Sequence, residues 1–112
     1  MVRLPTAAFL LTAAVACAGP RAGVRRADDA AVRFTYDGDA DEVYLTGDMT
    51  RWRPTPLVRA GRTWSKKVPV PRGRWEYRLE VHRRERVDVV LPADAERVDD
   101  GFGGENAVLR MP

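Results

Sequence analysis

The stretch RWEYRLEVH, residues 74–82, decides the fold that this sequence predicts. Its large apolar residues are Trp75, Tyr77, Leu79 and Val81. They occupy every second position, and charged or polar residues stand between them, which predicts a β-strand with one buried and one solvated face. A register shift of one residue would expose four large apolar groups, so the facing of this strand is firmly set. Arg78, in the middle of the stretch, is therefore expected to point away from the core.

Shorter segments on both sides of this strand show similar alternation. Apolar positions that fit strands occur in residues 32–36, 43–45, 57–58, 64–70 and 107–111. Turn sequences rich in Gly, Pro and Asp separate them, and none of these segments has a convincing helical period. About seven short strands with one apolar face each predict an all-β domain, folded as a β-sandwich.

Residues 1–17 are predicted to be a signal peptide, because an apolar run too short to span a bilayer ends at small residues. The run stops directly before Cys17, the single cysteine. This end resembles the lipobox of bacterial lipoproteins, in which the cysteine receives a diacylglycerol, although Ala14 stands where leucine is usual. Ordinary cleavage after Ala16 or Ala18 is the alternative. The lipobox reading places the protein in the cell envelope, anchored to a membrane on its periplasmic or surface side.

Residues 18–31 contain small and charged residues and few apolar ones. Such a segment cannot bury enough apolar surface to offset its chain entropy, so it is predicted to be a flexible linker. The folded domain is accordingly expected over residues 32–112. A single cysteine also excludes an internal disulfide, so the core alone must hold this domain together.

The charge distribution argues against nucleic-acid binding. The chain has 19 basic and 16 acidic residues and a net charge of +3. The two kinds are interspersed along the sequence, whereas a nucleic-acid footprint needs clustered basic residues. Neither a metal-ligand cluster nor a nucleophile with its base stands at a recognisable spacing. We therefore expect no enzyme activity, no cofactor and no metal site.

Three segments together resemble the glycogen-binding module of carbohydrate-binding module family 48. They are VYLTGDMTRW (43–52), PLVRAGRTWSKKVPVPRGRWEYRLEV (56–81) and DDGFGGENAVL (99–109). The same early-set domain occurs in the β subunit of AMP-activated kinase and at the N-terminus of isoamylases and branching enzymes. The resemblance implies an immunoglobulin-like sandwich, in agreement with the strand pattern.

The resemblance also implies three carbohydrate-binding residues. Trp52 matches the family's loop tryptophan, which stacks on a glucose ring, while Arg78 and Asn106 match its basic residue and its asparagine. Sugar rings present apolar C–H faces that stack on indole, and their hydroxyls pair with polar groups. Each residue also has a purely structural interpretation. Trp52 could pack under its loop, and Arg78 could pair with Glu76 or Glu80. Asn106 could fix the glycine turn before it.

One departure from the family weakens the predicted site. Binding members carry a second tryptophan after the central strand, but here no aromatic residue lies between Tyr77 and Phe102. Loss of one stacking surface costs about 1–3 kcal/mol, or about tenfold to a hundredfold in affinity. The sequence therefore predicts a noncatalytic module that binds an α-glucan weakly. The alternative is an early-set adaptor domain that has lost the sugar and binds another envelope protein.

Overall fold

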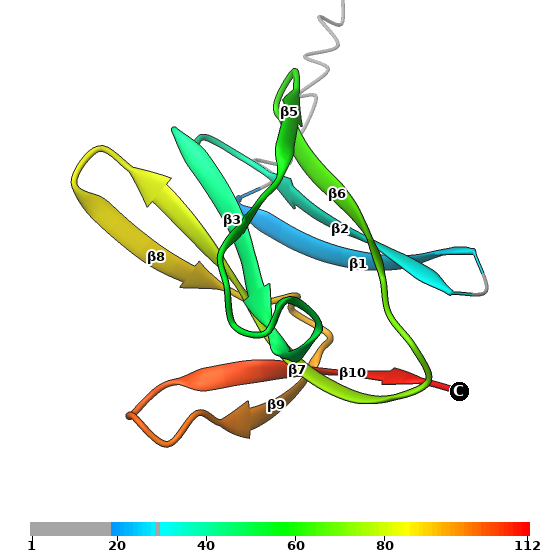
Figure 1. Cartoon of the computed structure of the whole chain (residues 1–112). Helices are drawn as coiled ribbons and strands as arrows, with labels where there is room; N and C mark the ends of the chain where they lie inside the picture. Colours follow the sequence, from blue (N-terminus) through cyan, green and yellow to red (C-terminus); the bar gives the residue numbers. More distant parts are fainter. Residues whose placement is uncertain (1–18, 29) are drawn as a thin grey trace, which may run out of the picture.

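The computed structural model describes residues 19–28 and 30–112, and within them ten strands and one short 3₁₀ helix form (Figure 1). Their bounds are β1 (Arg21–Asp28), β2 (Ala31–Asp37), β3 (Glu42–Gly47), η1 (Asp48–Thr50), β4 (Thr55–Pro56), β5 (Val58–Ala60), β6 (Thr63–Pro69), β7 (Gly73–Arg83), β8 (Arg86–Val90), β9 (Glu96–Asp99) and β10 (Glu105–Met111). The predicted all-β class is confirmed. The described residues form ten strands where about seven were expected, and some, such as β4 and β5, are very short.

The strands form two antiparallel sheets that pack face to face. One sheet has the order β1-β2-β6-β5, and the other has the order β4-β3-β7-β10-β9, with β8 also paired to β7. The chain crosses between the sheets after β2, after β4 and again after β6. This is the early-set, immunoglobulin-like sandwich that the strand pattern and the resemblance predicted.

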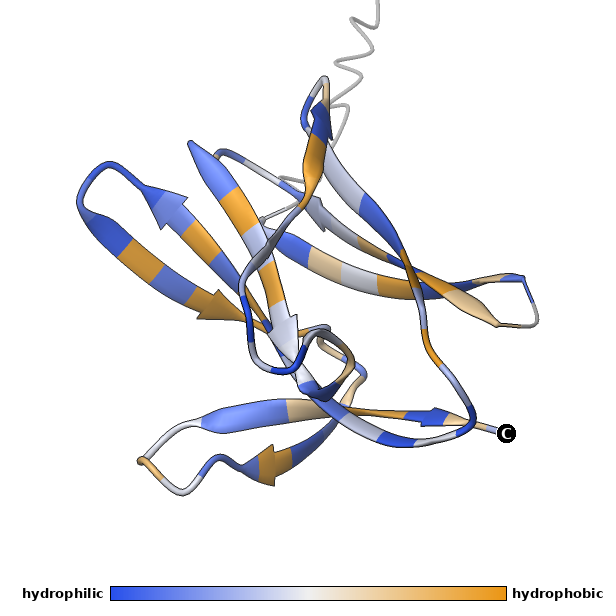
Figure 2. Ribbon diagram, viewed as in Figure 1, coloured by the Kyte–Doolittle hydropathy of each residue, from blue (hydrophilic) through white to orange (hydrophobic). Residues whose placement is uncertain are grey.

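The alternating pattern of the strands determines which residues enter the core. Apolar and polar residues alternate visibly along β3 and β8 (Figure 2). In β7, Tyr77, Leu79 and Val81 are each at most 1% exposed, and Trp75 is half-buried against the same core. Arg78 projects from the opposite face. The facing predicted for this strand is therefore confirmed.

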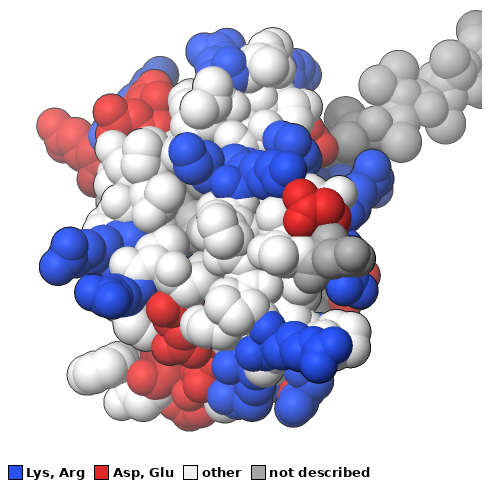
Figure 3. All heavy atoms as spheres, turned by 45° about the vertical axis from the view of Figure 1, so that its right-hand side comes forward, with Lys and Arg blue, Asp and Glu red and all other residues white. Residues whose placement is uncertain are grey.

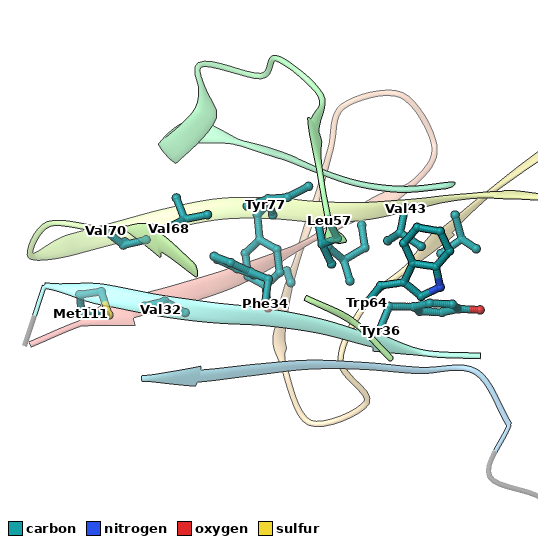
Figure 4. Packing of buried hydrophobic residues seen from close by; sticks show 14 residues of the cluster. Val32, Phe34, Tyr36, Val43, Leu57, Trp64, Val68, Val70, Tyr77 and Met111 are labelled. Atoms are coloured by element: carbon teal, nitrogen blue, oxygen red, sulfur yellow. The ribbon is translucent and has the colours of Figure 1, made fainter. Parts of the chain in front are cut away.

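The core is a continuous layer of side chains between the two sheets (Figure 4). At its centre the rings of Phe34 and Tyr77 meet edge to face, with their centroids 5.0 Å apart. Trp64 is 8% exposed and closes one end of this layer, as its place in an alternating strand predicted. Packing of aromatic rings in this geometry adds to the stabilisation that burial alone gives.

The predicted linker over residues 18–31 is wrong for most of its length. Residues 21–28 form β1, which pairs with β2 from Arg21 opposite Asp37 to Asp28 opposite Ala31. β2 already pairs with β6 on its other side, so β1 supplies partners for backbone groups of β2 that would otherwise form an open edge. An edge strand needs few apolar side chains, and Ala22 and Val24 suffice to pack against the core.

The predicted signal peptide and the candidate lipidation site Cys17 lie outside the described residues. Within the part of the chain that is described, no helix has the length and hydropathy needed to cross a membrane.

Candidate functional site

Trp52 lies in the loop that follows β3, where the chain passes close to β7. A Cβ atom at Gly47 would lie 2.6 Å from the backbone oxygen of Glu76, so the start of this loop requires glycine. Arg51 and Trp52 then adopt left-handed φ angles of 55° and 59°, which are uncommon for residues other than glycine. The N–H of Trp52 donates to the carbonyl of Gly47 at 2.8 Å. The loop directs the indole outward, and Trp52 is 41% exposed.

The carboxylate of Asp48 orients this indole and ties the loop to the sheet. Its Oδ1 accepts a hydrogen bond from Trp52 Nε1 at 3.0 Å. Its Oδ2 accepts one from the backbone N–H of Glu76 in β7 at 2.8 Å. The ring is therefore held in one orientation before any ligand arrives, which reduces the entropy lost on binding.

Arg78 contacts the Trp52 ring from the outer face of β7. The guanidinium carbon is 5.8 Å from the ring centroid, within the range of a cation–π contact. Arg78 Nε also donates to Glu80 Oε1 at 3.3 Å, so the predicted pairing with Glu80 and the predicted proximity to Trp52 are both present. The Arg78 side chain is 32% exposed, which leaves part of it accessible to a ligand.

Asn106 lies in the neighbouring strand β10 and shares the outer face with Arg78. Ala107 pairs with Tyr77, so Asn106 and Arg78 are the next residues along two antiparallel strands and project to the same side. Asn106 is 5% exposed, and its Oδ1 has no hydrogen-bond partner among the described residues. Its amide is therefore covered in this conformation, unlike the rings and guanidinium beside it.

The loop between β9 and β10 presents an exposed ring near this face. The Oδ1 atom of Asp100 accepts hydrogen bonds from the N–H of Phe102 at 2.7 Å and from that of Gly104 at 3.0 Å. These two bonds, and then the positive charge of Arg78, hold the pKa of Asp100 below its ordinary value. Asp100 thus fixes the glycine turn, the alternative role considered for Asn106. Phe102 at the loop tip is 94% exposed and takes no part in the core.

A second tryptophan is not available to this site, because Trp64 and Trp75 face the core. Tyr44 in β3 pairs with Glu80 and therefore faces the same side as Arg78. Its ring meets that of His82 edge to face, with centroids 5.0 Å apart. The rings of Tyr44 and His82 thus lie on this face. Among the described residues, Trp52 is the only tryptophan that faces outward there.

The surface is mixed in charge, as the sequence predicted. Figure 3 shows a face on which groups of Lys and Arg alternate with groups of Asp and Glu across uncharged surface. Ion pairs join many of them, such as Arg110 with Glu96 at 2.8 Å. Among the described residues no group of three or more His, Cys, Asp or Glu is placed to hold a metal ion.

Replacing Asp48 with alanine should destabilise the loop and release the Trp52 ring from its fixed orientation. The indole N–H would lose its acceptor and the loop its bond to Glu76, and an intramolecular hydrogen bond contributes about 0.5–1.5 kcal/mol. We expect a loss of about 1–2 kcal/mol in the free energy of unfolding, measured in urea. Asp41→Ala, which removes a carboxylate beside β7 far from Trp52, is the matched control. The resonance of the Trp52 indole N–H, followed by NMR, reports on this ring alone. An unchanged chemical shift and order parameter in Asp48→Ala would show that the carboxylate does not orient the ring.

The structure thus places Trp52 in contact with Arg78 and sets Asn106 beside Arg78 on the same face. Asp48 is an addition to the residues predicted from the sequence, because it binds the Trp52 indole directly. Asp48 was missed because its bond to Glu76 joins residues 28 positions apart.

Comparison with known proteins identifies one matching family model. None of the curated proteins matches the chain at a significant level. A family model described as the glycogen recognition site of AMP-activated protein kinase matches residues 30–110. These residues include β2 to β9, β10 except its last residue, and all of the site residues above. The chain belongs to the family of this glycogen recognition site, a family of carbohydrate-binding modules.

Proposed function

We propose that this chain is a noncatalytic module that binds α-glucan chains weakly and is anchored in a bacterial cell envelope. The observation that carries the glucan proposal is the contact between Trp52 and Arg78. An outward indole, fixed from behind by a carboxylate and flanked by a guanidinium, supplies the two kinds of group that a sugar ring needs.

The chemistry of such a site is simple. The apolar C–H face of a glucose unit stacks on the Trp52 indole, and the ring hydroxyls accept hydrogen bonds from the free N–H groups of Arg78. Phe102, which is 94% exposed, offers a further apolar surface for a neighbouring glucose unit. Asn106 takes part only if its covered amide becomes accessible, so it contributes less than the resemblance implies.

Weak binding follows from the number of rings. One tryptophan platform replaces the two of typical binding members, and this costs about 1–3 kcal/mol.

The proposal of a noncatalytic site is supported by the carboxylates around Trp52. Both oxygens of Asp48 accept hydrogen bonds, and Asp100 is held in its turn with a lowered pKa. A carboxyl group with a lowered pKa, such as that of Asp100, is a poor proton donor, and glycoside hydrolysis needs one that donates.

Titration of the purified protein with maltoheptaose by calorimetry tests the glucan proposal. We expect heat of binding that saturates, and none with cellohexaose, whose β-linked chain has a different shape. An absence of heat with maltoheptaose would reject glucan binding at this site. It would favour the second candidate, an adaptor domain for another envelope protein, which the missing tryptophan and the covered Asn106 support.

The envelope anchor is tested separately, through Cys17. A diacylglycerol contributes about 0.8 kcal/mol for each buried methylene, so a lipidated chain should sediment with membranes. In a bacterial host, Cys17→Ser should move the protein from the membrane pellet to the soluble fraction. Ala18→Ser, a change beside the same cleavage site, serves as the control and should stay in the pellet. Equal sedimentation of Cys17→Ser and the parent would reject lipidation.

A further inference from the structure

A cavity of about 390 Å³ lies at the other end of the sandwich from the Trp52 loop. Its lining comes from the β2–β3 turn, the β5–β6 turn and the end of β7. In Figure 1 these turns lie in the upper part of the view, whereas η1 lies below them. The cavity lies apart from the glucan site and borders the core at Trp64. Its charged lining residues are Asp39, Asp41, Arg59, Arg62, Arg83 and Arg84. We call these six residues the arginine end.

Two of its arginines are held in place by neutral groups. The guanidinium of Arg59 lies 5.9 Å from the centroid of the Trp64 ring, and its Nε donates to a backbone carbonyl at 2.9 Å. Arg83 Nε donates to the carbonyl of Asp39 at 2.7 Å, and its other arm donates to the hydroxyl of Tyr36. Neutral acceptors thus fix both guanidinium groups, and the carboxylates of Asp88 and Asp39 act on Arg83 only through their charge.

The other two arginines keep their side chains free of carboxylate partners within residues 19–28 and 30–112. No ion pair of that part of the chain includes Arg62 or Arg84. The lining of the cavity contains four arginines and two aspartates, so it carries an excess of two positive charges. One of these aspartates, Asp41, is already engaged, since its Oδ2 accepts a hydrogen bond from the backbone N–H of Arg84.

Arg84 also occupies a backbone conformation that does not favour arginine. Its φ angle is 52°, in the left-handed region where glycine and asparagine are preferred. The fold itself therefore does not require arginine here. A strained residue that the fold does not need is a reason to look for a function of its side chain.

We propose that the arginine end binds a phosphate-type oxyanion. Guanidinium groups are planar forks that pair with phosphate oxygens two at a time, and a cavity of about 390 Å³ is within the size range of small-ligand sites. Guanidinium groups also donate to sugar hydroxyls, but an uncharged glucose unit cannot balance an excess of two positive charges, whereas a phosphate-type oxyanion can. This site is therefore distinct from the one at Trp52.

Two sources can supply this oxyanion, a phosphate group in solution or the headgroup of an anionic phospholipid. The path of the chain makes the lipid accessible. β1 begins with Arg21 opposite Asp37, next to Gly38 in the lining of the cavity. Cys17 precedes Arg21 by four residues, which span at most about 14 Å when extended. If Cys17 carries the proposed anchor, the arginine end lies close to the membrane surface and the Trp52 site lies on the side away from it.

The test uses the full chain with Cys17→Ser, so that no acyl chain is attached, and inorganic phosphate as the probe. Phosphate should raise the melting temperature in a saturable way, and Arg84→Asn should need at least about tenfold more phosphate for the same rise, because one charge-assisted contact is lost. Arg72→Asn, the same change in the turn that precedes β7, controls for net charge and for the general stabilising effect of phosphate. Asparagine suits the left-handed backbone at position 84, so Arg84→Asn should melt no lower than its parent without phosphate.

Vesicles separate the two sources. If the ligand is a lipid headgroup, the Cys17→Ser protein should sediment with vesicles of phosphatidylglycerol and phosphatidylcholine but not with phosphatidylcholine alone, and Arg84→Asn should lose this sedimentation while Arg72→Asn keeps it. Phosphate protection without sedimentation would identify a phosphate group in solution. Equal responses of the Arg84 and Arg72 variants, or no response of the parent to either probe, would overturn the proposal. Maltoheptaose binding by Arg84→Asn should equal that of its parent, which keeps this test independent of the glucan proposal.

Discussion

Tyr77→Ala should unfold a large share of the protein at room temperature. Tyr77 is 1% exposed, lies at the centre of β7 and packs edge to face on Phe34 at 5.0 Å. Truncation of a buried aromatic residue costs about 3–5 kcal/mol, whereas the whole free energy of unfolding of a small domain is about 5–15 kcal/mol. Unfolding in urea, followed by circular dichroism, measures the loss.

Arg78→Ala is the matched control, one position further along the same strand. Its side chain lies on the outer face, where it forms a partly exposed ion pair with Glu80 and contacts the Trp52 ring, and ion pairs at a protein surface contribute about 0–1 kcal/mol. The midpoint of unfolding should therefore shift little. Losses of similar size in Tyr77→Ala and Arg78→Ala would contradict the facing of β7.

Tyr77→Phe separates the ring from its hydroxyl. Burial, and then the negative charge of Asp94, raises the pKa of Tyr77 above 10.0. The folded state therefore holds the phenol proton more tightly than the unfolded state does. This contribution to stability is complete below pH 10 and falls as the pH rises above it, by about 1.4 kcal/mol per pH unit. Tyr77→Phe should lack this alkaline loss, and it should be at least as stable at pH 7, since the hydroxyl has no partner in the described part of the chain.

The alternation of β7 predicted its structure correctly because large apolar groups leave one way to place the strand. The same reasoning failed for β1, since its stability comes from backbone hydrogen bonds with β2 and not from apolar side chains. Hydropathy patterns report burial, and they miss edge strands that are mostly solvated. The residues of β1 also lie before the part of the chain that the family model matches.

The candidate site was predicted in part for a related reason. The sequence placed Trp52 on a loop but left its direction open, because that direction depends on the left-handed backbone at Arg51 and Trp52. The burial of Asn106 depends on the strands beside it, which no local pattern encodes. The arginine end was missed altogether, since three turns far apart in the sequence have to meet before it exists.

Trp52→Asn should remove glucan binding while leaving the fold intact. The ring is 41% exposed, so its loss removes little core packing, and asparagine accepts the left-handed φ angle of 59°. The only stacking tryptophan of the site would be lost, which lowers a weak affinity by about tenfold to a hundredfold. Trp52→Phe retains a smaller ring and should keep part of the binding. A fall of several kcal/mol in stability for Trp52→Asn would show instead that the indole is a packing residue.

Affinity electrophoresis through a native gel containing glycogen tests the central proposal most directly. Parent and Trp52→Asn run side by side in gels with and without the polysaccharide, and thermal unfolding of both is recorded in parallel. We predict that glycogen slows the parent, that Trp52→Asn runs as it does without glycogen, and that the two proteins unfold at similar temperatures. A parent protein that glycogen does not slow, or a variant slowed as much as the parent, would contradict α-glucan binding at Trp52.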